Sequence, residues 1–332
     1  MYFTILDLFR LLSSIAVLFH HTFLFHYGRL GIYLFFMISG FVIYFSLNKG
    51  IKEYVTGRLL RLFPIFWVCA TITYLITVLY HINISFKHYL LGLLMFNNGH
   101  MEIMIDGSYW TLTFELLFYF YIGVFVWLFG KKRLEWFYTG WLLLCFLCFY
   151  FRIDQMMIFK LLSIRFAPYF VFGGMLALLV DKWNTSSYIS KVMHVSTLIA
   201  SWLMPIYVSS RLQAQKDTIT NFTGSFDVGE LFIVELLFVI MYFAVILSFY
   251  DFTKNKTFSK VVFLLGGMTY PLYLLHWKIG KTLIGSYEEY GHVTILSAIV
   301  ALALVLVSFF LSIYDQKFRT FFKVTFLDQV KV

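Results

Sequence analysis

Charged residues are scarce in this chain of 332 residues. Asp, Glu, Lys and Arg together make up 13% of it, whereas hydrophobic residues make up 61%. The mean hydropathy is +0.82, which lies far outside the range of soluble domains. The shortage of charge therefore excludes a soluble protein and indicates an integral membrane protein.

Other features are missing as well. The chain has only three cysteines, all in apolar runs, so no disulfide framework is implied and we interpret them as core residues. Cys145 and Cys148 have the spacing of half a zinc site, but there is no second half. We find no internal repeat, no low-complexity tract and no linker long enough to separate two domains. These absences predict a single membrane-embedded domain spanning residues 1–332.

Long apolar runs are abundant. A helix needs about 20 apolar residues to cross the hydrocarbon core of a bilayer, and the sequence contains about ten such segments. They span residues 5–26, 30–47, 59–81, 110–129, 134–151, 158–180, 192–209, 229–250, 260–285 and 292–314. The run at 86–98 is too short to span and is predicted to be interfacial or re-entrant. The first segment has no small-residue cleavage pattern after it, so we do not expect a cleaved signal peptide.

The distribution of lysine and arginine predicts the orientation. With ten spans both termini share one side, and the loops on that side hold more Lys and Arg than those on the other. The positive-inside rule therefore predicts an all-α polytopic protein with both termini in the cytoplasm. The net charge of +9 follows from this topology and from contact with anionic membrane lipid, so no nucleic-acid partner is implied.

The first span carries ionisable residues, which are costly inside a bilayer and usually have a function there. Arg10 and His21 are eleven residues apart, so on a helix they lie on nearly the same face, about 16 Å apart along the axis. Asp7 lies one turn before Arg10 and is its predicted ion-pair partner. The sequence therefore predicts a polar stripe along this helix.

Other polar residues are expected at the depth of His21. Glu115 lies about two turns below Trp110 on a helix that enters from outside, and Arg165 enters from the same side. His276 reaches the outer third after the helix breaker Pro271. We expect His21, Glu115, His276 and Arg165 to converge on one chamber open to the outside.

Two arginines, Arg58 and Arg61, lie one turn apart at the start of the third predicted span. Guanidinium groups bind phosphate through paired hydrogen bonds and stay charged. The alternative is that both residues only anchor the topology.

Five motifs occur in order along the chain: Arg10 and His21 separated by ten residues, FFMISGF at 35–41, RLLRLFP at 58–64, WTLTFELLFY at 110–119 and YPLYLLH at 270–276. With these motifs the chain resembles the acyltransferase-3 family of bacterial membrane O-acyltransferases. The resemblance covers nearly the whole sequence.

The resemblance implies ten helices and transfer of an acyl group, usually acetyl, from cytoplasmic acyl-CoA to a hydroxyl of an envelope glycan. It implies that His21 is the essential catalytic histidine, that Arg10 is its paired arginine, and that Arg58 and Arg61 are the arginines that follow the second span. Many relatives carry an extracytoplasmic SGNH hydrolase-like domain at the C-terminus. Since this chain ends soon after its tenth predicted span, we expect that contribution to be absent or supplied by another protein.

Acylation of an alcohol needs a base for the hydroxyl proton and donors for the developing oxyanion. Our hypothesis is that neutral His21 is the general base; the alternative is transient acetylation of His21 itself. Glu115 would orient an imidazole or bind sugar hydroxyls as the second catalytic residue. Trp110, His276, Arg165 and Asp7 are candidates for binding the acceptor. Arg10, Arg58 and Arg61 would bind the phosphates of acetyl-CoA, the only cofactor that we expect.

Structural interpretations compete with these assignments. His21 and His276 could be interhelical hydrogen bonders, and Trp110 could be an aromatic-belt anchor. We interpret Ser39 and Gly40 as small residues for close helix packing. Ser108 lacks the context of a nucleophile elbow. His20, His21 and His26 have no carboxylate or thiol spaced to complete a metal site, so no metal is predicted.

Two other functions remain possible for intramembrane Arg, His and Glu. One is a proton-coupled transporter, although we find no paired inverted halves; the other is a flippase for a lipid-linked glycan without covalent chemistry. Our preferred hypothesis is O-acetylation of a lipid-linked surface polysaccharide, such as O antigen, in the bacterial inner membrane.

Overall fold

The computed structural model describes residues 3–23, 25–82, 84–95, 104–154, 156–213, 226–249, 256–285, 293–322 and 325. The described chain is all-α and contains no β-strand. It divides into two compact units: unit 1 contains residues 32–54 and 114–250, and unit 2 contains residues 2–31, 55–113 and 251–332. The single domain expected over residues 1–332 stays a prediction, and the two units are described in turn.

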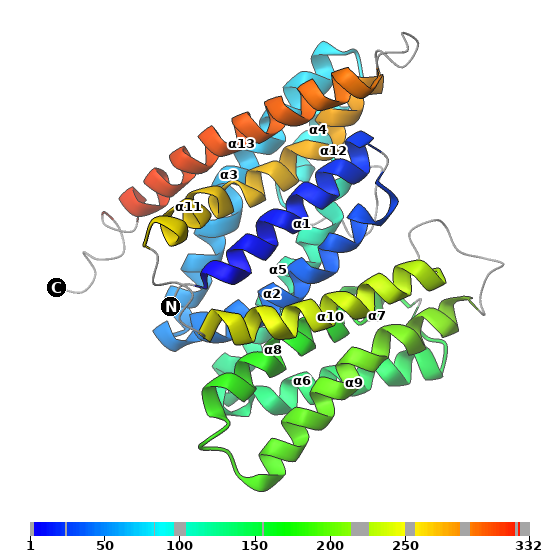
Figure 1. The fold of residues 1–332 in the computed structure, drawn as a ribbon, viewed down its shortest axis with the longest axis vertical. Coiled ribbons are helices and arrows are strands. Elements are labelled where there is room, and N and C mark those ends of the chain that lie inside the picture. Colours follow the sequence, from blue (N-terminus) through cyan, green and yellow to red (C-terminus); the bar gives the residue numbers. More distant parts are fainter. Residues whose placement is uncertain are drawn as a thin grey trace. The chain divides into compact units, whose positions relative to one another are not determined.

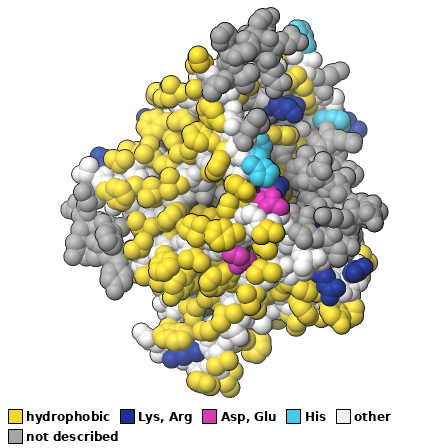
Figure 2. All heavy atoms as spheres, turned by 45° about the vertical axis from the view of Figure 1, so that its right-hand side comes forward, with side chains coloured by type: hydrophobic (Ala, Val, Ile, Leu, Met, Phe, Trp, Pro, Cys, Tyr) yellow, Lys and Arg dark blue, Asp and Glu magenta, His cyan; other side chains and the backbone are white. Residues whose placement is uncertain are grey.

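Within the described ranges, eight helical segments are long and apolar enough to cross a membrane. They are Thr4–Phe23, His26–Ser46, Ile51–Leu79, Gly107–Phe129, Tyr188–Leu212, Val228–Phe249, Thr257–Gly285 and Ile295–Phe322. Hydrophobic side chains dominate the face drawn in Figure 2, as expected where lipid replaces water as the solvent. The protein is therefore a polytopic, all-α membrane protein.

Unit 1 is built around one enclosed helix, α8 (Ala167–Lys182). Residues 167–178 of α8 are all buried. α6 (Leu134–Tyr150) and α9 (Tyr188–Gln213) pack against it, and α10 (Val228–Phe249) contacts both α8 and α9 (Figure 1). The other elements of this unit are α2 (Gly31–Ser46), η2 (Leu47–Lys49), most of α5 (Trp110–Phe129), η5 (Lys131–Arg133) and α7 (Met157–Leu161).

Glycines allow α2 and α8 to touch backbone to backbone. A Cβ atom added to Gly40 would lie 2.1 Å from the carbonyl oxygen of Phe170, and one added to Gly173 would lie 1.8 Å from that of Met37. No larger residue fits at either position, which is the usual chemistry of close helix crossings in membranes. The predicted packing role of Gly40 is confirmed.

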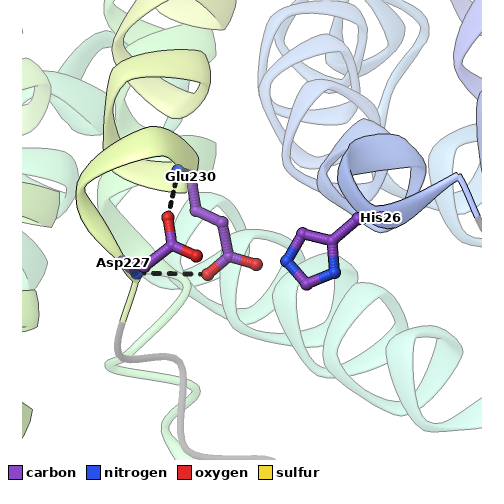
Figure 3. A group of neighbouring side chains, drawn as sticks. All are labelled: His26, Asp227 and Glu230. Carbon is purple, nitrogen blue, oxygen red and sulfur yellow. Dashed lines mark hydrogen bonds between the residues drawn. The ribbon is translucent and has the colours of Figure 1, made fainter.

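α10 begins with a capping box, drawn in Figure 3. The Glu230 amide donates to Asp227 Oδ1 at 2.7 Å, and the Asp227 amide donates to Glu230 Oε2 at 3.2 Å. Each side chain thus satisfies an amide of the first turn that the helix itself leaves without a partner. These carboxylates therefore have a structural role at the start of α10.

Unit 2 contains the first helix and the last three. α1 (Thr4–Phe23) packs against α11 (Lys256–Gly267), α12 (Thr269–Gly285) and α13 (Val293–Phe322), as Figure 1 shows. The unit also holds η1 (His26–Leu30), most of α3 (Ile51–Leu79), α4 (Phe86–Gly92) and η4 (Gly107–Tyr109). η1 folds back on α1 at Gly28, where an added Cβ atom would lie 2.0 Å from the Ala16 carbonyl oxygen.

Three predicted boundaries need correction. The segment predicted at 158–180 is not continuous: α7 ends at Leu161, Ser163 has φ 55°, and α8 begins at Ala167, with Pro168 in its first turn, where proline is favoured. The segment predicted at 260–285 is divided between α11 and α12 at Met268. α3 begins at Ile51 rather than near 59, directly after Gly50.

Two predicted spans are short. α6 has 17 residues and α8 has 16, so α8 extends about 24 Å, less than the ~30 Å hydrocarbon core. The run predicted to be interfacial contains the seven-residue helix α4 and therefore does not span, as expected. Its last residues, 96–98, lie outside the described residues.

Candidate functional site

The polar stripe predicted on α1 is present. Asp7 and Arg10 form an ion pair, with 3.2 Å between Asp7 Oδ1 and Arg10 Nη1. Both side chains are largely buried, and α11 approaches them at Gly266, where an added Cβ atom would lie 3.2 Å from Asp7 Cβ. His21 is in the last turn of the same helix. Arg10 and His21 thus lie on one face of α1, near opposite ends.

His21 meets a second histidine from α12. The ring centroids of His21 and His276 are 5.1 Å apart, and those of His21 and Trp277 are 6.0 Å apart. His20 lies on the other side of His21, at 4.7 Å, and its Nδ1 donates to the Phe25 carbonyl oxygen at 2.9 Å. The structure therefore brings together two of the predicted site residues, His21 and His276, and adds Trp277, which sequence reasoning missed.

His276 is held in one orientation. Only 1% of it is exposed, and its Nδ1 lies 2.7 Å from the Tyr273 carbonyl oxygen. A carbonyl oxygen only accepts, so Nδ1 carries the proton and Nε2 carries the lone pair. Within the described residues, Nε2 is buried and has no hydrogen-bond partner. The site thus contains an imidazole nitrogen able to accept a proton or hydrogen bond.

A turn ahead of α5 reaches the same part of α12, and sequence reasoning missed it too. Asp106 is fully buried, and its carboxylate accepts from the backbone amides of Ser108 at 2.7 Å and Lys278 at 2.8 Å. Ser108 Oγ also donates to it at 2.7 Å. The only signal in the sequence was an Asp directly before Gly-Ser, a pattern common in turns.

The two arginines of α3 lie in unit 2 with the histidines. Arg58 and Arg61 are half-buried, and they lie in the third and fourth turns of α3 rather than at its start. Arg61 interacts electrostatically with Asp315 and Arg319 of α13, which form an ion pair of 2.6 Å. This pair was also missed, since its relation to Arg61 depends on a contact between distant helices.

The break between α11 and α12 lies beside this charged group. Tyr270 donates to the Leu62 carbonyl oxygen at 3.3 Å, next to Arg61. A Cβ atom added to Gly267 would lie 2.5 Å from Gln316 Nε2, one residue after Asp315. Since Gly266 faces Asp7 on the other side, the ion pairs of α1 and α13 both pack around this break.

Glu115 belongs to unit 1 and is described there. Its Oε1 accepts hydrogen bonds from Ser39 Oγ, at 2.9 Å, and from the Tyr119 hydroxyl. Ser39 was expected only to allow close packing, a role that Gly40 fills; its hydroxyl binds Glu115 instead. The expected convergence of Glu115 with His21 stays a prediction.

The remaining two predicted site residues, Trp110 and Arg165, lie in different units. Trp110 is the first residue of α5 and follows the turn that contains Asp106. Arg165, in unit 1, forms a 2.7 Å ion pair with Asp154, whose side chain is fully buried. This partner was not recognised in the sequence, and a role of Arg165 in binding the acceptor stays a prediction.

Unit 1 also contains a groove of about 420 Å³ between α5 and α6. Its lining is almost wholly apolar and aromatic: Tyr121, Val124, Phe125, Leu128, Phe129, Trp136, Phe137, Gly140, Trp141, Leu144 and Leu162. None of the predicted site residues lines it. Its Tyr121 hydroxyl donates to the Leu161 carbonyl oxygen at 2.8 Å, so the groove differs in character from the histidine site of unit 2.

Comparison with known families agrees with the motifs. The model of the acyltransferase-3 family, described as an acyltransferase domain, matches residues 3–314. The matched range includes the α1 stripe, both arginines of α3, the turn at Asp106 and His276, all in unit 2, and it also covers the whole of residues 32–54 and 114–250 of unit 1. No curated protein and no solved structure matches the chain. The chain therefore belongs to the acyltransferase-3 family of membrane O-acyltransferases.

Proposed function

We propose that this acyltransferase moves an acetyl group from cytoplasmic acetyl-CoA to a hydroxyl of a lipid-linked or surface polysaccharide, most simply an O antigen, across the bacterial inner membrane. The observation that carries the proposal is the α1 stripe: Arg10 and His21 share one helix face, and His21 meets His276 at 5.1 Å. A cation for the donor and a base for the acceptor are thus carried by one helix.

The base in this proposal is His21. Neutral His21 takes the proton of the acceptor hydroxyl as its oxygen attacks the thioester carbonyl, and the proton then passes to the sulfur of CoA. The imidazole is half-buried, with aromatic and imidazole rings around it. A partly dry site of this kind strengthens the electrostatic interactions that stabilise the transition state.

The donor would be bound by the arginines of unit 2. Arg58 and Arg61 lie one turn apart on α3, and Arg61 is close to the Asp315–Arg319 pair. Guanidinium groups suit the phosphates of CoA because they donate paired hydrogen bonds. Arg10, paired with Asp7, would join them in binding the CoA phosphates, and the pantetheine arm would reach from there toward His21.

The acceptor would be bound by the remaining polar and aromatic residues. Trp110 offers a flat apolar face for a sugar ring, and Glu115 and Arg165 offer groups for sugar hydroxyls. No metal enters this scheme. Both termini in the cytoplasm and a site open toward the outside complete the proposal.

The test is transfer of label from acetyl-CoA to a candidate glycan by the purified protein. We expect His21→Ala to transfer at least 10²-fold less than wild type, with an unchanged thermal melt. His20→Asn is the matched control, because the asparagine amide can still donate to the Phe25 carbonyl oxygen from the position of Nδ1, and it should keep transfer within a few-fold. Equal transfer by His21→Ala and wild type would remove His21 from the mechanism.

The alternative is a proton-coupled transporter or flippase. It is favoured only by the intramembrane charges themselves, Asp7, Arg10 and Arg165 among them. Such a protein would show substrate-driven counterflow in vesicles with no covalent change in the glycan. Mass spectrometry of the surface glycan from cells with and without the protein identifies the acceptor, because each lost acetyl group changes the mass of the repeat.

A further inference from the structure

The turn ahead of α5 forms hydrogen bonds with the backbone of α12. In an α-helix the amide of residue 278 and the carbonyl of residue 274 form one pair of the backbone pattern. Here the Lys278 amide donates to Asp106 Oδ2 at 2.8 Å, and the Leu274 carbonyl accepts from the Tyr109 hydroxyl at 3.0 Å. Both groups of that pair therefore bind side chains from outside the helix, at the turn that carries His276 and Trp277.

The turn is held rigidly against α12. Both oxygens of Asp106 are engaged, since Oδ1 accepts from Ser108 and Oδ2 from Lys278. Burial raises the pKa of the Asp106 carboxyl to about 6, so it is still mostly ionised at neutral pH and can accept all these bonds. Gly107 packs against the Trp277 ring, since an added Cβ atom would lie 1.7 Å from the indole.

Tyr273 adds a second set of contacts to the same turn. Its hydroxyl donates to the Ser108 carbonyl oxygen at 3.0 Å and lies 2.7 Å from Thr111 Oγ1. Its carbonyl accepts from His276 Nδ1. Residues 106–109 and Tyr273, which we call the α12 clamp, thus fix both the backbone and the ring of His276.

The clamp leaves one nitrogen available. His276 Nε2 is buried without a hydrogen-bond partner in the described part of the chain, and a buried polar atom in this state costs free energy. Its ring lies next to His21. A lone pair kept open at this cost, beside the imidazole expected to become protonated, indicates a function in the reaction.

We propose that His276 accepts a hydrogen bond from His21 when His21 takes the proton of the acceptor hydroxyl, and that Asp106 is the positioning residue that holds His276 for this. The inference rests on the proposed transferase function. During transfer the hydroxyl oxygen bonds to the thioester carbon, the C–S bond breaks, and the proton moves through His21 to the sulfur. His276 is unchanged at the end. It stabilises the imidazolium as a carboxylate does in other hydrolytic and transfer sites, without a second buried charge.

Two substitutions of His276 test the acceptor role. His276→Asn keeps an N–H where Nδ1–H was and loses the acceptor at Nε2, whereas His276→Gln reaches the Nε2 position with a carbonyl oxygen. We expect kcat to fall about 10²-fold in His276→Asn, to recover at least several-fold in His276→Gln, and KM for acetyl-CoA to stay unchanged in both. Wild-type kcat in His276→Asn, or equal losses in both variants, would overturn the proposal.

The α12 clamp can be tested by a measurement that does not depend on enzyme activity. In protein labelled with ¹⁵N-histidine, the signal lost in His276→Asn reports the tautomer of His276, which we expect to be neutral with its proton on Nδ1. Asp106→Asn turns an N–H₂ group toward the Ser108 or Lys278 amide, so this signal should become a mixture of tautomers and kcat should fall at least 10-fold. A wild-type signal with its proton on Nε2 contradicts the clamp whatever the activity.

The matched control is Asp181→Asn in unit 1. Asp181 accepts one hydrogen bond, from the Tyr44 hydroxyl at 2.7 Å, and an asparagine carbonyl can still accept it. The variant should keep the His276 signal and kcat. If wild type transfers no label at all, the proposed function and the role at His21 fail together, and the ¹⁵N signal still decides whether the clamp exists.

Discussion

Each unit contains a buried histidine that makes one hydrogen bond with one ring nitrogen. In unit 1, His194 Nε2 lies 2.6 Å from Glu135 Oε2, and the same oxygen accepts from Ser190 at 2.7 Å. In unit 2, His276 Nδ1 donates to a backbone carbonyl, and its ring faces another histidine. Both leave one nitrogen without a hydrogen-bond partner among the described residues.

The difference between the two histidines lies in their neighbours. His194 shares a carboxylate with a serine and ties α9 to α6, so its hydrogen bond has a structural role. His276 shares its surroundings with His21 and with a turn that fixes its tautomer. Burial and a one-sided hydrogen bond therefore do not distinguish the two histidines; the His21 ring next to His276 does.

The largest effect is expected when one methyl group is added to the α12 clamp. Gly107→Ala must displace Trp277, since the new Cβ atom would lie 1.7 Å from its ring, and we expect kcat to fall about 10²-fold. Gly140→Ala, in α6, is the control because nothing lies within 4 Å of its added Cβ atom. It should leave transfer unchanged. Equal activity in the two variants would mean that the position of Trp277 is not important.

Removing His194 should lower the stability and leave kcat unchanged, which is the opposite of the result expected for Gly107→Ala. His194→Ala leaves Glu135 with one hydrogen-bond donor fewer and opens a cavity, so the melting temperature in detergent should fall by an amount equivalent to about 2 kcal/mol. The kcat of the protein that remains folded should not change. A loss of kcat at temperatures well below the melt would place His194 in the reaction as well and end the distinction.

A smaller effect is expected at the donor arginines. Arg61→Lys keeps the charge near Asp315 but loses the planar fork, so KM for acetyl-CoA should rise about 10-fold with kcat retained. Arg133→Lys, at an exposed arginine where α6 begins, is the control in unit 1 and should change neither constant. An unchanged KM in Arg61→Lys would assign the arginine to topology alone.

The smallest effect is expected at Asp227, which caps α10 as Asp106 caps η4. Asp227→Ala removes the N-cap of α10 in unit 1 and should cost about 1 kcal/mol of stability, measured as a shift in thermal melt. Transfer should be unaffected. A loss of transfer comparable with that in Asp106→Asn would show that capping itself, rather than the contact with α12, is what the reaction needs.

Local features of the fold and the site could be predicted from the sequence. The apolar runs gave the helices, and the spacing of Asp7 and Arg10 gave an ion pair within one helix. In each case the evidence lies within a single segment.

Features that depend on distant contacts could not be predicted. Asp106 binds an amide 172 positions away in the sequence, and Ser39 binds a carboxylate 76 positions away. Neither residue differs from an ordinary turn or packing residue by its local context. The division of the segment at 158–180 was missed because Pro168 was read as part of an apolar run, although proline there marks a first turn.

The crossing of α2 and α8 has a consequence for biogenesis. α2 leaves the ribosome well before α8 is made, so the backbone surface around Gly40 must remain without its partner, the backbone at Phe170, while the intervening helices are inserted. Until then that surface faces lipid or another helix with small residues. The same glycine that permits the tight contact in the finished protein is therefore a point at which a nascent chain can mispair or be recognised by insertion factors.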